Sequence, residues 1–235
     1  MKFHRLPKGS MLQKAIRVIL ICGVIIFLLA PFVPGLWMPP EVSNRARLLS
    51  GVNAAQNIHK AAFMMAQEAA VKESDNYGWP GDLYASGKIT NVSDYMNRLV
   101  GDGFLPVGAL KTFAGSEPKS GFIPYEGEIK GRGKNAKLDP PFRPENCAFK
   151  IYLVKKSDGD NALFLVSKNY TYNQPLNAKS KPYGKKGFVV VRKDGSGAAL
   201  RAGEVDDLEY IGLLPGQTDS EYPVAEQIGI HVLPE

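Results

Sequence analysis

The amino-acid sequence predicts an α+β fold in which a long N-terminal helix packs on an antiparallel sheet. Two observations lead to this prediction. An uncharged run at 18–38 is followed by a helical pattern at 41–74, and strand-like segments alternate with tight turns at 147–202. Helical and strand patterns that occupy separate parts of a chain are typical of α+β proteins, whereas α/β proteins alternate them.

The uncharged run at 18–38 contains 21 residues without a charged side chain. A helix of that length rises about 30 Å, which is enough to cross the hydrocarbon core of a bilayer. The preceding basic residues are Lys2, Arg5, Lys8, Lys14 and Arg17, and no acidic residue stands among them. This excess of positive charge places the N-terminus in the cytoplasm. We therefore expect a transmembrane segment at 10–38 and an exported domain after it.

A cleaved secretory signal is the alternative interpretation, because a basic start and the apolar core at 18–30 suit one. The residues at 30–40 contain several prolines and no small-residue cleavage site, and Trp37 stands where an interfacial anchor is expected. These features favour a retained membrane anchor over a removed signal peptide.

The helical pattern after Pro40 carries an apolar stripe at steps of three, four and seven residues. The stripe consists of Leu48, Ala55, Ile58, Ala62, Met65 and Ala69. We expect Ile58 and Met65 to be buried against the sheet. His59 lies near the stripe with no second His or Cys at ligand spacing, so the pattern favours a core-edge histidine over a metal ligand.

Two β-hairpins are predicted in the second half of the chain. Their strands are expected at 147–154 and 162–167, around a turn at 157–161, and at 187–192 and 198–201, around a turn at 193–197. Strands that tight turns join pair in an antiparallel sheet.

The remaining segments complete the predicted organisation. The connecting region is rich in Gly and Pro, with one short helix at 92–100 that Asn91 or Ser93 caps. The segments are a leader at 1–9, a transmembrane segment at 10–38, an amphipathic helix at 39–74, a connecting region at 75–146, the sheet at 147–202 and an unassigned C-terminal extension at 203–235.

Composition argues against several other classes of function. The net charge is +6, but the leader contributes three of these charges, so the chain from Ser10 onward gives little reason to expect a nucleic-acid partner. The glycine- and lysine-rich stretch at 129–137 is interpreted as a solvated loop, because it lacks the spacing of a phosphate-binding P-loop. Of the two cysteines, Cys22 lies in the apolar run and Cys147 is interpreted as a buried strand residue, so no disulfide is expected.

Catalytic and metal-binding motifs occur only as fragments. The Ser116 to Lys119 spacing resembles a β-lactamase motif, but Pro118 breaks the helix that would align the two side chains. Asp158 and Asp160, and the acids at 204–207, offer oxygen ligands for calcium, yet turn chemistry explains such residues equally well. We expect no enzymatic activity, no metal and no cofactor.

The N-terminal part resembles the type IV pilins and the pseudopilins of type II secretion. In that family a short basic leader ends in glycine and is cut on the cytoplasmic side by a prepilin peptidase, and Gly9 followed by Ser10 is similar to that junction. Counting from Ser10, Pro31 falls where these proteins carry the proline that kinks the helix. The segments at 45–58 and 75–80 resemble the family's helix and the turn that follows it.

Two residues depart from the family pattern. Ser10 replaces an aromatic residue, and Lys14 replaces the glutamate that pairs with the amino terminus of a neighbouring subunit. A lysine at this subunit-pairing position repels that amine, so we expect the chain to suit the tip of a filament better than a place beneath another subunit.

The resemblance implies a non-enzymatic minor or tip pseudopilin of a type II secretion or type IV pilus-like system. Its location would be the inner membrane, with a single pass, a cytoplasmic N-terminus and a periplasmic C-terminal domain. Its partners would be the membrane, other pseudopilin subunits and a prepilin peptidase. The alternative is a single-pass, membrane-anchored periplasmic binding domain that does not polymerise.

Overall fold

The computed structural model describes residues 18–21, 40–115, 121–131, 136–218 and 225–235. The chain divides into two compact units, Met1–Ser43 and Asn44–Glu235, and each is described by itself. In the first unit, residues 18–21 are helical and exposed. The second unit contains both sheets and all the other elements described below, apart from the first turn of helix α3.

Helix α3 (Pro40–Lys72) is 33 residues long and agrees with the predicted amphipathic helix to within two residues at either end. A proline is tolerated in the first turn because the amide lost there has no helical partner. The helix ends where Glu73 adopts a φ of +47° and the Ser74 amide donates to the Ala69 carbonyl at 3.2 Å, which is the geometry of a Schellman end.

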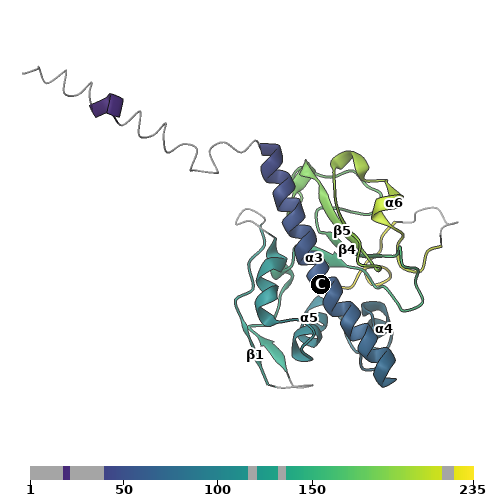
Figure 1. Cartoon of the computed structure of the whole chain (residues 1–235). Coiled ribbons are helices and arrows are strands. Elements are labelled where there is room, and N and C mark those ends of the chain that lie inside the picture. Colours follow the sequence, from purple (N-terminus) through teal and green to yellow (C-terminus); the bar gives the residue numbers. More distant parts are fainter. Residues whose placement is uncertain (1–17, 22–39, 116–120, 132–135, 219–224) are drawn as a thin grey trace, which may run out of the picture. The chain divides into compact units, whose positions relative to one another are not determined.

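The predicted apolar stripe of α3 is buried over most of its length. Leu48, Ala55, Ile58, Ala62 and Met65 are buried, and Ala69 is partly exposed. Figure 1 shows strands β4 and β5 on one side of α3 and helix α5 on the other. The stripe therefore contributes to the core of the second unit.

The main sheet has four antiparallel strands in the order β3-β4-β5-β6. The strands are β3 (Phe149–Ile151), β4 (Leu163–Ser167), β5 (Phe188–Arg192) and β6 (Gly197–Leu200). Both predicted hairpins are present, and the predicted α+β class with an antiparallel sheet is confirmed. All five residues of β4 are buried.

The connecting region has more structure than the sequence predicts. Its helices are α4 (Pro80–Ala85) and α5 (Val92–Gly101), its 3-10 turns are η2 (Val107–Ala114) and η4 (Pro144–Asn146), and its strands are β1 (Glu128–Lys130) and β2 (Lys137–Asp139). The helix expected at 92–100 is confirmed as α5, and Asn91 is its cap because its side chain accepts from the Asp94 amide at 2.9 Å.

Two local predictions in this region are corrected. The stretch at 129–137 begins and ends in strand, because β1 and β2 pair as a small antiparallel sheet. Cys147 is buried as predicted, but it caps η4 ahead of β3 and is not a strand residue. Burial raises the pKa of the Cys147 thiol to about 11, so this cysteine is a packing residue with little thiolate character.

The C-terminal residues add a cover to the free edge of β3. After η5 (Gly184–Lys186), η6 (Ala202–Glu204) and α6 (Leu208–Ile211), the segment 225–235 pairs with the chain at β3. The Leu233 amide donates to the Ile151 carbonyl at 2.9 Å, and the Leu153 amide donates to the His231 carbonyl at 2.7 Å. An edge strand whose amides are paired in this way is less open to association with another chain.

Candidate functional site

The residues to which the pilin resemblance gives a role lie outside the described residues. They are Gly9 and Ser10 at the expected processing point, Lys14 at the subunit-pairing position and Pro31 at the expected kink. Of the expected transmembrane segment, only residues 18–21 are described. Among the described residues, no helix combines the length and the hydropathy that a membrane crossing requires.

The contact between α3 and the main sheet is close because glycines stand at the points of approach. A Cβ atom at Gly51 of α3 would lie 3.1 Å from Val189 Cγ2 of β5, and one at Gly197 of β6 would lie 2.9 Å from Val52 Cγ1 of α3. The missing side chains let the helix backbone approach strands β5 and β6.

His59 is the buried polar residue of this contact, with 6% of its surface exposed. Its Nε2 lies 2.7 Å from the Lys193 carbonyl, and a carbonyl can only accept, so Nε2 carries the proton and donates. The imidazole ring lies edge-on to Phe164 of β4 at 5.4 Å and tilts over Trp79 at 5.8 Å. Burial lowers the pKa of His59, while the Lys193 carbonyl and the Asp194 carboxylate oppose this change. His59 is thus a hydrogen-bonded core histidine, consistent with its position beside the stripe.

The turns of the two hairpins are joined through Lys193. Its Nζ donates to the Lys156 carbonyl at 2.9 Å and to the Asp158 carbonyl, and the Asp194 amide donates to the Asp160 carbonyl at 3.0 Å. Asp158 and Asp160, which the sequence offers as calcium ligands, take part in this turn-to-turn contact. Within the described parts of the chain, no group of three or more His, Cys, Asp or Glu residues is arranged to hold a metal ion.

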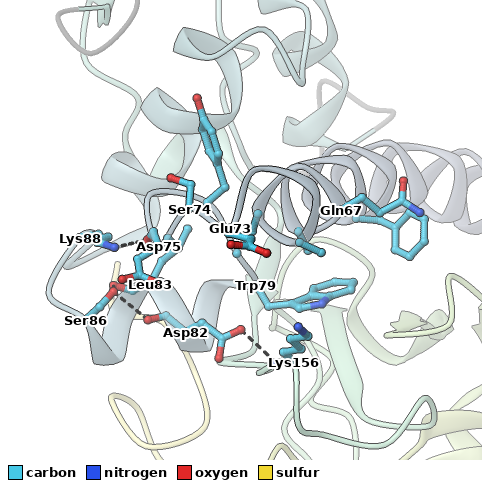
Figure 2. A pocket seen from close by; sticks show the side chains of 16 residues that line it. Gln67, Glu73, Ser74, Asp75, Trp79, Asp82, Leu83, Ser86, Lys88 and Lys156 are labelled. Carbon is cyan, nitrogen blue, oxygen red and sulfur yellow. Dashed lines mark hydrogen bonds between the residues drawn. The ribbon is translucent and has the colours of Figure 1, made fainter.

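A groove of about 730 Å³ opens beside the C-terminal end of α3 (Figure 2). The last turns of α3, the turn that follows and helix α4 form its sides, and Lys156 lies at its edge. Trp79 lies in the groove below the end of the helix, and the ring centroids of Trp79 and Phe63 are 6.3 Å apart. The groove therefore combines the exposed Phe63 and the largely buried Trp79 with the polar residues of the turn, such as Glu73 and Asp75.

A second cluster of polar groups ties the C-terminal segment to the sheet. The Glu226 carboxylate accepts from the Tyr152 hydroxyl at 2.6 Å and from the Tyr172 amide at 3.2 Å, and it forms an ion pair with Lys150. Burial, followed by the charge of Glu226, raises the pKa of Tyr152 well above its usual value. Since every oxygen of this carboxylate has a donor, the cluster fixes the C-terminal segment in place.

Sequence reasoning did not find the groove or the Glu226 cluster. A signal for the groove is present in the sequence, because alanines replace larger apolar residues on α3 after Met65. No comparable signal marks Glu226, whose partners lie more than 50 residues away in the chain.

Comparisons with protein families, with curated proteins and with solved structures find no match to this chain.

Proposed function

We propose that the chain is a membrane-anchored α+β protein whose N-terminal helix both holds it in the membrane and forms part of its exported domain. Within this class, the proposal is a non-enzymatic pseudopilin-like subunit of a type II secretion or type IV pilus-like system. It is a minor or tip subunit of the inner membrane, with its C-terminal domain in the periplasm.

The observation that supports this proposal most is the packing of α3. Helix α3 follows an uncharged N-terminal run. Its stripe of small and branched residues, which includes Ala55 and Ile58, is buried in the core beside an antiparallel sheet. This is the arrangement that the resemblance to pilins implies. The glycine junction at Gly9 and Ser10 and the proline at Pro31 agree with the same interpretation at the level of sequence.

Lys14 supports the more specific role of a tip subunit. An unpaired charge inside a bilayer costs several kcal/mol, and the new amino terminus of Ser10 would stand near the like charge of Lys14. The first subunit of a filament has no subunit above it. At that position the side chain of residue 14 therefore has no neighbouring amino terminus with which it must pair.

The second candidate is a single-pass, membrane-anchored periplasmic binding domain that does not polymerise. The groove beside the end of α3 favours this alternative, because a hollow with aromatic and polar lining is typical of a binding surface. Both candidates share the anchor and the export of the C-terminal domain.

The mature N-terminus distinguishes the two candidates. The chain is expressed in cells with a prepilin peptidase and in matched cells without it, and its mass is measured intact. A pseudopilin is expected to begin at Ser10 only in the cells with the peptidase, whereas a binding domain retains Met1 in both.

Gly9→Val is the matched control, because it replaces the residue that the peptidase is expected to recognise and leaves the apolar run unchanged. It should keep the full mass in both strains. A wild-type chain that retains Met1 in the presence of an active peptidase would overturn the pseudopilin proposal.

A further inference from the structure

The groove beside α3 arises because the helix extends past the core. Met65 is the last buried residue of α3. Of the alanines that follow it, Ala66 and Ala69 are half-buried and Ala70 is exposed. Their short side chains line a hollow of about 730 Å³ between the helix end and α4. Helix α4 and the turn before it form the opposite side of the hollow.

The apolar lining of the groove is aromatic as well as aliphatic. Phe63 is 43% exposed at one end, and Tyr77 and Trp79 line the side formed by the turn. The faces of aromatic rings attract cations. Two lysines of the chain already use this attraction, because Lys72 Nζ lies 5.9 Å from the centroid of Tyr77 and Lys193 Nζ lies 5.8 Å from that of Trp79.

Carboxylates outnumber lysines along the groove. Glu73 and Asp75 are exposed and form no ion pair with any residue that the structure describes, and the Asp82 carboxylate accepts from the Lys156 backbone amide at 2.9 Å. The other lysine of the lining, Lys88, donates its Nζ to the Asp75 carbonyl. Figure 2 shows Glu73 above Trp79 and Asp82 below it. This acidic rim is notable in a chain whose net charge is +6.

We propose that the groove binds a basic, apolar peptide segment of a partner protein. Lysine and arginine lay their aliphatic stems along apolar surface and keep the charged head near polar groups. The alanines, Phe63 and Tyr77 supply that surface, and Glu73, Asp75 and Asp82 supply the opposite charge. The carboxylates of the rim would repel an acidic segment, and a purely apolar segment would leave these carboxylates without partners. The inference does not depend on the pseudopilin assignment.

Binding of matched short peptides to the full-length chain in zwitterionic lipid nanodiscs tests this proposal. The probe is a fluorescein-labelled peptide of alanine and leucine with one central arginine, and two further peptides carry citrulline or glutamate in place of the arginine. Fluorescence anisotropy is measured against empty nanodiscs. The arginine peptide should bind more tightly than the citrulline peptide, the glutamate peptide should bind least, and added salt should weaken the arginine peptide most.

Two pairs of variants locate the site. Glu73→Gln with Asp75→Asn should weaken binding of the arginine peptide about fivefold, since each exposed charge pair contributes up to about 1 kcal/mol. Glu126→Gln with Glu209→Gln makes the same change of charge at exposed positions outside the groove lining and should leave binding unchanged.

Filling the groove gives an independent measurement. Ala70→Trp places a large side chain in the groove from an exposed helix position and should abolish binding, whereas Val71→Trp, at a neighbouring position that does not line the groove, should not. Equal binding of the arginine and citrulline peptides, or equal losses in the groove variants and their controls, would overturn the proposal. Failure of the wild-type chain to bind the arginine peptide would overturn it as well.

Discussion

The packing of α3 beside the sheet can be tested at Ile58, whose side chain is 0% exposed. Ile58→Ala removes the Cγ1, Cγ2 and Cδ1 atoms from the core. At about 0.8 kcal/mol for each buried carbon group, the lost transfer free energy is about 2.4 kcal/mol. The cavity left behind adds to this loss, because the neighbouring side chains relax only in part, so we expect a total in the upper part of the range of about 2 to 4 kcal/mol.

The free energy of unfolding is measured by urea titration of the full-length chain in detergent micelles. Trp79 is a suitable probe because it lies in the core, and a Trp37→Phe background isolates its fluorescence. Val71→Ala is the control on the same helix, since Val71 is 80% exposed and should change stability by less than about 0.5 kcal/mol. A loss below about 0.5 kcal/mol for Ile58→Ala would refute the reasoning, because it would mean that this face of α3 is not packed in the core.

Further predictions concern Gly51, His59 and Lys14. A Cβ atom at Gly51 would lie 2.1 Å from the hydroxyl oxygen of Tyr183, so Gly51→Ala should cost about 1–3 kcal/mol. Tyr183→Phe removes a hydroxyl that has no hydrogen-bond partner in the described structure and should recover much of this loss; equal losses in both backgrounds would contradict the contact. Because burial lowers the pKa of His59, the unfolded chain binds that proton more readily. The free energy of unfolding should therefore fall as the pH decreases from about 7 to 5, and His59→Gln should flatten this dependence more than His231→Gln does. Lys14→Glu should increase crosslinking of the chain to itself or to a major pseudopilin, and unchanged crosslinking would favour the binding-domain alternative.

The elements that sequence reasoning predicted well are those that local patterns specify. The stripe through Ile58 repeats with the period of a helix, and its burial follows from that spacing. Asn91 precedes α5 with the side chain that caps helices, and its bond to the Asp94 amide is a contact between near neighbours. The two hairpins likewise follow from turn residues that stand between apolar runs.

The elements that it missed are short or depend on distant partners. Strands β1 and β2 have only three residues each, too few for a period of two to be recognised. The Leu138 amide of β2 donates to the Asn97 side chain at 2.9 Å, which couples this small sheet to α5 across 41 residues of sequence. A contact of that range leaves no local pattern in the sequence.

The sequence by itself determined the α+β class, the long helix and its buried face, because periodicity and turn chemistry act between neighbouring residues. Only the tertiary structure decided where α3 leaves the core, and hence that Ala66 and Ala70 line a groove with Trp79. It also decided that Glu226 meets Tyr152 from 74 residues away. Such sites depend on which surfaces the folded chain brings together, and that outcome is a property of the whole packing rather than of any one segment.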